Sequence, residues 1–385
     1  AAPRTTQARS TAEYRALDAA HHIHPFSDMG ALNRAGSRVI VKADGVYLWD
    51  SDGNKVIDGM AGLWCVNVGY GRKELADAAY RQIQELPFYN TFFKTTHPPV
   101  IELSAMLAEV TPAGFNHFFY CNSGSEGNDT VLRLVHQYWR VQGKPQKKYV
   151  ISRKNGYHGS TIAGGTLGGM GYMHEQMPSK VEHIVHIDQP YFFGEAQAGE
   201  TPEAFGLARA QQLEAKILEL GAENVAAFIG EPFQGAGGVI FPPSTYWPEI
   251  QRICRKYDIL LVADEVIGGF GRTGEWFAHQ HFGFEPDLIT TAKGLTSGYV
   301  PMGAVGIHER IARPIIDNGE FNHGLTYSGH PVAAAVAVAN LKLLRDEGIV
   351  ERVKHDTGPY FQALMRETFA RHPIVGEVHG HGMVA

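Results

Sequence analysis

Charged residues at the ends of two apolar runs are the first candidates for chemistry in this chain. The run 259–263 ends in Asp264-Glu265, and the run 288–292 ends in Lys293. Asp, Glu and Lys are seldom fully buried unless they are paired or used. A carboxylate and an amine at two strand ends could act on one ligand from two sides. The pair suits a carbonyl compound that is bonded to the lysine and tuned by the acid.

Apolar runs that alternate with helical patterns indicate which elements would carry these residues. Strand-like runs occur at 118–120, 149–151, 225–229, 259–263, 288–290 and 303–306. Helical patterns include 73–86, 99–110, 125–139, 203–220, 245–257 and 332–344. Such alternation is typical of a mostly parallel sheet that is covered on both faces. Ligands bind outside the carboxyl ends of such strands, where Asp264 and Lys293 fall.

The length of the chain favours more than one domain, because single cores stop growing beyond about 250–300 residues. We predict an N-terminal segment at 1–72 that forms part of a small domain, and a large domain at 73–331. Residues 332–385 are expected to complete part of the small domain, apparently without its last segment.

Three smaller features accompany this division. The runs 39–41 and 46–50 flank Asp44-Gly45 and predict short antiparallel strands with a tight turn. A helix over 349–371 should be interrupted at Gly358-Pro359. The last residues, 382–385, are expected to begin an apolar strand that has no partner.

Composition excludes several function classes. The chain has 385 residues, a formal net charge of −6, 44% hydrophobic residues and 19% charged residues, which describes an ordinary soluble globular protein. No basic stripe or tail favours nucleic acid, and no apolar run is long enough to span a bilayer. The N-terminus lacks the apolar core of a signal peptide. We therefore expect a cytoplasmic protein that binds neither nucleic acid nor membrane.

Cysteines and histidines are the residue types that could hold a metal. Cys65, Cys121 and Cys254 are far apart and form no CxxC pair, so reduced thiols are the simplest interpretation. The close histidines His21, His22 and His24 raise the hypothesis of a metal site. Since no acidic or cysteine partner is evident at ligand spacing, we expect no metal.

A loop of small residues offers a phosphate site. The segment 122–126, Asn-Ser-Gly-Ser-Glu, follows a strand and opens a helix. Backbone N–H groups at a helix start bind phosphate well. The alternative is a plain helix N-cap. The presence of Asp264 and Lys293 in the same chain favours phosphate.

Two further strand-end or loop residues could face the same ligand. Tyr157 stands with His158 between Gly156 and Gly159, and could stack on a flat heteroaromatic ring. A surface turn with a half-buried tyrosine is the alternative. Glu231 ends another apolar strand, where it could instead cap a neighbouring helix.

The segment 269–274 matches GxGxxG and suggests a dinucleotide site. Its glycines come several residues after the strand that ends at Asp264, so they do not form the immediate turn of that strand. The match also lies deep in the chain, and bulky residues follow it. We therefore interpret these glycines as a loop near the site, and a dehydrogenase as the weaker hypothesis.

The combined motifs resemble those of the class III aminotransferases, which are pyridoxal-phosphate (PLP) enzymes of fold type I. The motifs are Ala263-Asp264-Glu265-Val266, Gly271-Arg272-Thr273-Gly274 and Lys293-Gly294, with the two loops described above. The resemblance implies an α/β fold, with a mostly parallel sheet in the large domain and a smaller α+β domain from both chain ends. The runs 62–70 and 87–93 are similar to the ω-amino acid (amine):pyruvate branch.

The resemblance also implies roles for individual residues. Lys293 would hold the cofactor and move the proton, and Asp264 would pair with the ring nitrogen. The implied cofactor-binding positions are Ser123, Gly124, Ser125, Tyr157, His158, Glu231, Asp264, Val266, Lys293 and Thr326. The implied substrate pocket comprises Phe26, Trp64, Phe92, Tyr157 and Ala236. Thr326 would come from the neighbouring subunit, which implies a homodimer, or a tetramer, with shared active sites.

This chain departs from the family pattern at two places. Ile267 stands where many members carry a glutamine that meets the phenolic oxygen of the cofactor, although the amine:pyruvate branch is alike in this. The arginine that binds the substrate carboxylate is expected beyond Ala385, and Glu231 then lacks the partner it has in some relatives.

The resulting hypothesis is an aminotransferase that moves an amino group from an ω-amino acid or amine to pyruvate in a ping-pong reaction. One alternative is another reaction on the same cofactor, such as that of an aminomutase. A second is a non-catalytic cofactor-binding protein. The sequence does not fix the physiological donor.

Overall fold

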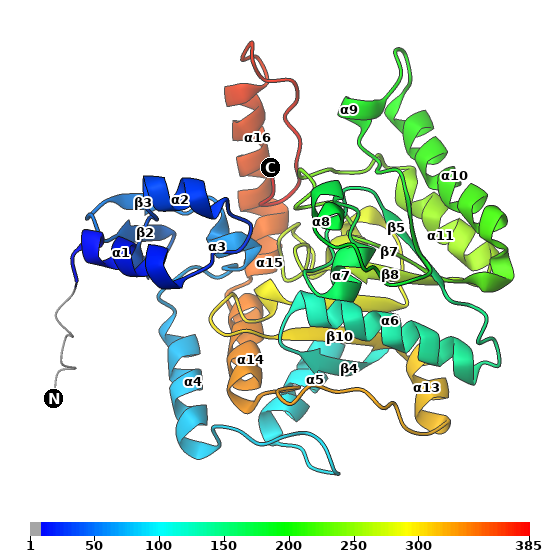
Figure 1. The fold of residues 1–385 in the computed structure, drawn as a ribbon, viewed down its shortest axis with the longest axis horizontal. Coiled ribbons are helices and arrows are strands. Elements are labelled where there is room, and N and C mark those ends of the chain that lie inside the picture. Colours follow the sequence, from blue (N-terminus) through cyan, green and yellow to red (C-terminus); the bar gives the residue numbers. More distant parts are fainter. Residues whose placement is uncertain (1–8) are drawn as a thin grey trace.

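A seven-stranded sheet forms the centre of the computed structural model, which describes residues 9–385 (Figure 1). The first eight residues of the predicted 1–72 segment lie outside the described residues. In spatial order the strands are β4 (Phe115–Cys121), β10 (Gly303–His308), β9 (Leu288–Thr291), β8 (Leu260–Asp264), β7 (Val225–Gly230), β5 (Tyr149–Arg153) and β6 (Ile184–Ile187). All neighbours pair in parallel except β10, which is antiparallel to both β4 and β9. The predicted mostly parallel sheet is confirmed.

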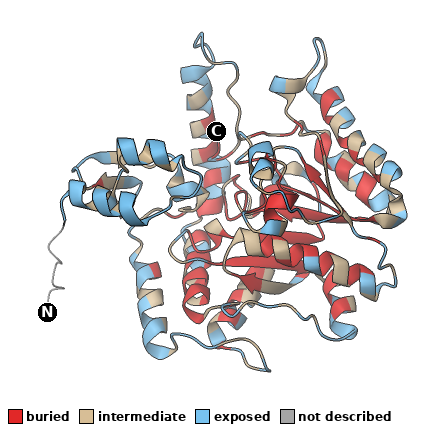
Figure 2. Ribbon diagram, in the orientation of Figure 1, coloured by how far each residue is buried: buried red, intermediate tan, exposed pale blue. Residues whose placement is uncertain are grey.

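Helices cover both faces of this sheet because its strands are apolar on both sides. On β8, Leu260 and Val262 pack toward one helical layer, and Leu261 and Ala263 pack toward the other. This alternation follows from the two-residue period of a strand. The first layer contains α6 (Gly124–Val141), α7 (Ile162–Leu167) and α13 (Glu309–Asp317), and the second contains α10 (Pro202–Leu220) and α11 (Tyr246–Lys256). Figure 2 shows the resulting buried centre.

A third apolar cluster joins the sheet edge near β4 to three long helices. These are α4 (Lys73–Glu85), α5 (Pro98–Val110) and α14 (Pro331–Asp346). The helix α14 packs on both α4 and α5. Its small residues, among them Ala333, Ala334 and Ala337, are buried and allow this close approach. The first residues of the predicted C-terminal segment therefore pack on helices of the predicted large domain.

The N-terminal residues form a separate, largely exposed layer (Figure 2). Its elements are α1 (Thr11–His21), α2 (Met29–Ala35), β1 (Ile40–Asp44), β2 (Tyr47–Asp50) and β3 (Lys55–Ile57). The three strands form an antiparallel sheet in chain order. The turn predicted at Asp44-Gly45 joins β1 to β2, and the prediction is confirmed.

The C-terminal residues differ in two details from their prediction. The helix breaks as expected near Gly358, but a π turn at Val353–Thr357 precedes the break, between α15 (Ile349–Arg352) and α16 (Gly358–Phe369). The strand predicted at 382–385 is wrong. His381 and Val384 bridge across a tight turn that Gly382 permits with a φ of 57°.

The remaining elements are short. They are α3 (Ala61–Trp64), α8 (Gly171–Glu175), α9 (Phe192–Glu195), α12 (Ala278–Phe282) and two 3-10 turns at Ala222–Asn224 and Lys293–Leu295. Within residues 9–385 no helix combines the length and apolarity needed to cross a membrane. The three cysteines are free thiols.

Candidate active site

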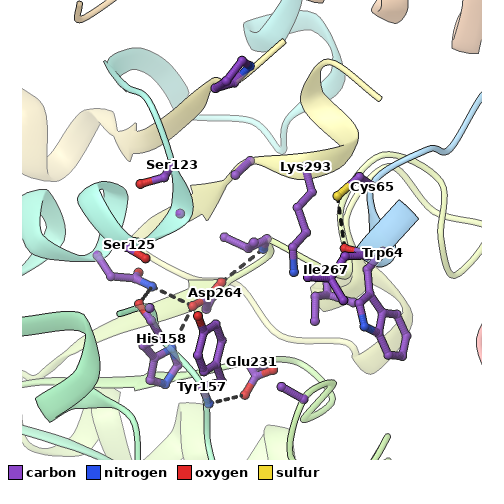
Figure 3. Close-up of a pocket in the computed structure, with 18 of the residues that line it drawn as sticks. Trp64, Cys65, Ser123, Ser125, Tyr157, His158, Glu231, Asp264, Ile267 and Lys293 are labelled. Atoms are coloured by element: carbon purple, nitrogen blue, oxygen red, sulfur yellow. Dashed lines mark hydrogen bonds and ion pairs between the residues drawn. The ribbon is translucent and has the colours of Figure 1, made fainter. Parts of the chain in front are cut away.

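A cavity of about 570 Å³ opens where β7, β8 and β9 reach their carboxyl ends (Figure 3). Most of the predicted site residues line it together. From the cofactor set these are Ser123, Gly124, Ser125, Tyr157, His158, Glu231, Asp264, Val266 and Lys293. From the substrate set they are Phe26, Trp64, Tyr157 and Ala236. The edge of a parallel sheet thus collects residues that are far apart in the sequence.

Asp264 is the last residue of β8 and points into the cavity. Its side chain is 4% exposed and accepts three hydrogen bonds. His158 Nδ1 and Asn128 Nδ2 donate to Oδ2 at 2.7 and 2.8 Å, and the Val266 backbone N–H donates to Oδ1 at 3.1 Å. The carboxylate is therefore fixed in orientation, and Oδ1 keeps capacity for one more donor from the cavity.

Glu265 follows directly but has a different task, because neighbouring residues at a strand end point to opposite sides. It is fully buried and accepts from the backbone N–H groups of Ala278 and His279 at 2.9 and 2.7 Å, and from His279 Nδ1 at 2.9 Å. These contacts hold the start of α12. Of the two adjacent carboxylates, only Asp264 is available for a ligand.

Lys293 lies two residues after β9 and starts a 3-10 turn, with its backbone in the left-handed region at a φ of 43°. Burial lowers the pKa of its amine from the ordinary value, although Asp264 and Glu231 oppose the shift. Within residues 9–385 this amine has no hydrogen-bond partner. A desolvated amine is a better nucleophile at neutral pH than an ordinary lysine, because more of it is unprotonated.

The start of α6, where an anion site is predicted, lies at the cavity. Ser123 is the N-cap, and its hydroxyl accepts from the Glu126 backbone N–H at 3.2 Å. Gly124 has no room for a side chain, since a Cβ would lie 2.7 Å from a methyl group of Val266. An 18-residue helix directs its positive end toward the cavity from here. The Ser123 hydroxyl caps the helix, whereas backbone N–H groups at its start would bind a phosphate. The N-cap interpretation and the phosphate interpretation of this loop are therefore compatible.

Tyr157 is held at the cavity by its backbone. Its N–H donates to Glu231 Oε1 at 3.0 Å, while the Gly235 N–H donates to Glu231 Oε2 at 2.9 Å. Glu231 is buried, and this burial raises the pKa of its carboxyl group. The glutamate therefore connects the loop of Tyr157 to the loop after β7, rather than capping a helix.

Aromatic residues form the outer wall of the cavity. Phe26 and Tyr157 meet edge to face with ring centroids 6.2 Å apart. Phe26 and Trp64 both have left-handed backbones, with φ values of 50° and 63°. Ile267 also lines the cavity and adds to its apolar surface.

Two predicted site residues do not line the cavity of their own chain. Phe92 lies against Gly324, where a Cβ would come within 2.7 Å of its ring. Thr326, two residues later, is exposed. Phe92 and Thr326 thus belong to one surface region outside this cavity.

Sequence reasoning missed several residues that line the cavity. They include Asn128, which contacts Asp264, and Cys65, Met170 and Tyr172 on the apolar side. Asn128 follows Gly124 by four residues, so helical spacing places it one turn behind the anion site. Cys65 adjoins Trp64 and could have been included with it. Nothing in the local sequence marks Met170 or Tyr172.

The N-terminal histidines do have an acidic partner, contrary to the argument given above against a metal. Asp18 accepts from His22 Nδ1 at 3.1 Å and from His24 Nε2 at 2.9 Å. One ligand atom from each of these three residues lies within 4.8 Å of the others. The helical spacing of Asp18 and His22, four residues apart, was the signal overlooked.

The GxGxxG segment forms turns and no dinucleotide-type helix start. Asn67 Nδ2 donates to the backbone oxygen of Phe270 at 2.9 Å, and Arg272 donates to Asn67 Oδ1 at 2.6 Å. The loop therefore links the main sheet to the segment around residue 67 beside the cavity.

Comparisons with known proteins identify the family of this chain. The family model "Aminotransferase class-III" matches residues 31–385. A putrescine–pyruvate aminotransferase from Pseudomonas aeruginosa is 60% identical over 97% of this chain and 82% of that protein. A diaminobutyrate–2-oxoglutarate transaminase from Halomonas elongata is 45% identical over 91% of this chain and 76% of that protein.

Solved structures give the same result. An (S)-enantioselective ω-transaminase from Thermomicrobium roseum superimposes with a TM-score of 0.93 and 44% identity, covering 98% of this chain and 83% of that chain. An ω-transaminase from Pseudomonas jessenii gives a TM-score of 0.93 at 42% identity, covering 96% of this chain and 82% of that chain. With the predicted lysine and aspartate at one cavity, these matches show that the chain belongs to the class III aminotransferase family.

Proposed function

We propose that this enzyme transfers an amino group from an aliphatic amine to pyruvate, with PLP bound in the cavity at the ends of β7 to β9. The observation that carries the proposal is that Asp264 and Lys293 face one cavity from adjacent strands, with the start of α6 at the same cavity. Class III aminotransferases depend on PLP as a family, and the donor groups of this cavity fit that molecule.

Individual residues of the cavity suit individual parts of PLP. The N-terminus of α6 at Gly124 and Ser125 suits the phosphate group, and the free capacity of Asp264 Oδ1 suits a protonated ring nitrogen. Tyr157 and Val266 would hold the two ring faces. The Lys293 amine would be the nucleophile for the carbonyl carbon, whose oxygen would leave as water.

When bound, PLP supplies an electron sink for the carbon from which a proton is removed. The residues of this chain supply the rest. Lys293 would take this proton and return it to a neighbouring atom. The negative charge of Asp264 would keep the ring nitrogen protonated.

The donor is inferred from the cavity and from the relative that is 60% identical. That relative is named for putrescine and pyruvate. The cavity wall is apolar around Phe26, Leu63, Trp64 and Met302, which suits an alkyl chain. We propose short aliphatic amines and diamines as donors. Each donor would leave as an aldehyde or a ketone before pyruvate enters, and pyruvate would leave as alanine.

We further propose a homodimer in which the partner completes each site. Phe92 and Thr326 lie together outside the cavity of their own chain. The same region exposes apolar rings, with Phe93 at 91% and Tyr327 at 56% exposure. Exposed aromatic rings of this kind mark protein interfaces. A mixed dimer of one Lys293→Ala chain and one Thr326→Ala chain tests this proposal. The site that keeps Lys293 receives Thr326 from the other chain, so that site should bind PLP with normal affinity.

Isotope transfer tests the function directly. The PLP-loaded protein is incubated with pyruvate and with 15N-labelled putrescine or another amine of a donor panel. We expect the label in alanine, and no label with the Lys293→Ala variant. An aminomutase would leave the nitrogen on the donor skeleton, and a non-catalytic protein would leave the cofactor spectrum unchanged on addition of amine. Either result across the whole panel would overturn the proposal.

A further inference from the structure

Asn128 is buried behind Asp264 on the helix that begins at the anion site. It lies on α6 one turn after Gly124 and is 1% exposed. Its Nδ2 donates at 2.8 Å to Asp264 Oδ2 and also at 2.8 Å to the backbone oxygen of His158. Although Asn128-Asp129-Thr130 matches a glycosylation sequon, this burial leaves no access for a glycan.

We propose that Asn128 is a positioning residue for the reaction, which sets the orientation of the Asp264 carboxylate relative to the anion site at Gly124. The inference deepens the proposed function, because Asp264 is the group that would meet the cofactor ring. Asn128 itself acts through Asp264 and needs no contact with the substrate.

The chemistry of the amide permits one orientation only. Both groups that face Nδ2 are acceptors, so a flipped amide would place Asn128 Oδ1 against two oxygen atoms. In the observed orientation Oδ1 has no partner among the described residues. A buried acceptor without a partner is unfavourable. The cost of this unpartnered oxygen indicates that the two hydrogen bonds donated by Asn128 Nδ2 have a specific role.

Asn128 also fixes the second side-chain donor of the carboxylate. His158 Nδ1 donates to Asp264 Oδ2 at 2.7 Å, and the backbone oxygen of the same histidine is held by Asn128. One amide thus holds both the carboxylate and the residue that supports it. Removal of the amide should loosen the two together, and a loss limited to one hydrogen bond is not expected.

Helix α6 fixes the distance between Gly124 at the start of the helix and Asn128 one turn later. Four residues along an α-helix correspond to about 6 Å, so α6 sets the separation between Gly124 and Asn128. Because the helix is 18 residues long and packed on the sheet, that separation is rigid. A ligand with an anionic group at one end and a basic ring nitrogen at the other would then meet α6 at one end and Asp264, which Asn128 of α6 holds, at the other.

The test compares Asn128→Ala and Asn128→Asp with the wild-type protein. Alanine removes the donor, and aspartate keeps the shape while replacing the donor by a second carboxylate. Asn224→Ala serves as the control, since Asn224 Nδ2 holds only the backbone oxygen of Leu220 far from the cavity. The readouts are the dissociation constant of PLP and the thermal unfolding temperature of the cofactor-free proteins, both measured from pH 5 to pH 9.

We expect PLP to bind about tenfold more weakly to Asn128→Ala, which corresponds to the loss of about 1.4 kcal/mol. Asn128→Asp should bind PLP well at low pH, where the introduced carboxyl group is protonated and can donate to Asp264 in place of the amide. Its affinity should fall as the pH rises, because two adjacent carboxylates repel. Asn224→Ala should change the unfolding temperature alone.

The cofactor-free proteins separate this inference from the proposed function. Asn128→Asp should lose thermal stability with rising pH relative to wild type, even if PLP does not bind. If wild type fails to bind PLP, the proposed function is wrong, and the stability profile still decides the role of Asn128. If Asn128→Asp matches wild type in both pH profiles, or if Asn128→Ala behaves like Asn224→Ala, the positioning role is overturned.

Discussion

The strand β9 has a charged residue near each end, and the two ends are built in opposite ways. Before its first residue, Asp287 is buried and accepts from the Leu261 backbone N–H at 2.8 Å and from Arg310 Nε at 2.7 Å. After its last residue, Lys293 has no hydrogen-bond partner among the described residues. Burial raises the pKa of Asp287, but Arg310 opposes this shift.

The difference separates charges that support the fold from charges that serve a reaction. Asp287 has its partners within the chain, so its charge is satisfied without a ligand. Lys293 is desolvated and unpaired among the described residues, which costs stability and leaves an amine ready to react. We therefore propose that the carboxyl-end edge of the sheet is the reactive edge and that the amino-end edge is structural. The following experiments test that division, in order of expected effect.

Lys293→Ala should reduce transamination by at least about 10³-fold, because it removes both the nucleophile and the group that moves the proton. The fold should remain, since the amine has no partner to lose among residues 9–385. Steady-state alanine formation and circular dichroism measure the two properties. Activity within tenfold of wild type would place the reactive amine elsewhere.

Asp264→Asn should reduce kcat by about 10²-fold, because the ring nitrogen loses a fixed negative charge at a desolvated site. The amide can still accept one hydrogen bond, so PLP should remain bound, although more weakly. Stopped-flow absorbance of the first half-reaction checks the rate. Glu265→Gln is the contrasting variant, and it should lower the unfolding temperature more than it lowers kcat. If the two variants exchange these effects, the assignment of the adjacent carboxylates is wrong.

Arg310→Ala should lower the free energy of unfolding by about 2 kcal/mol, since it leaves Asp287 buried without its partner. The expected value is below that of a fully buried pair, because Arg310 is 47% exposed. Urea unfolding measures it, and kcat should stay unchanged. Arg313→Ala, which breaks an exposed pair with Glu309, should cost about 0.5 kcal/mol or less. Equal losses from both variants would contradict a structural edge built on Asp287.

The pH dependence of stability should carry a smaller signature of Lys293. Its pKa is lowered in the folded protein, so the unfolded chain binds this proton more readily between that lowered value and about 10.5. Over this window the lysine makes the stability of the cofactor-free protein rise with pH. Lys293→Met should remove that contribution, whereas Lys148→Met, at an exposed position, should not. Identical urea-unfolding profiles for both variants would show that Lys293 is not desolvated.

The central fold could be predicted from the sequence because its signals are strong. The strands β7 and β8 are continuous apolar runs that end in charged residues, and helical patterns separate them. The strand β6 was missed because Ile184–Ile187 is only four residues long, includes His186 and lies at the sheet edge. The end of the chain was misjudged because the turn at Gly382 depends on backbone angles that an apolar pattern does not reveal.

The candidate site was predictable where residue type and position both carry information. Asp264 and Lys293 stand out because charge at the end of a buried strand is rare. Asn128 did not, because its role depends on the approach of α6 to β8, which is a property of the folded chain. The position of Phe92 and Thr326 outside the cavity of their own chain likewise depends on how the chain folds and not on the order of its residues.

The left-handed backbones of Phe26 and Trp64 limit how the donor pocket can change during evolution or engineering. At a positive φ, β-branched side chains are strongly disfavoured, whereas glycine is tolerated. Replacement by leucine, methionine or glycine can therefore widen the pocket with the backbone in place, but valine, isoleucine and threonine would have to move the chain. New donors should arise through side-chain length at these two positions, along a path that excludes branching at Cβ.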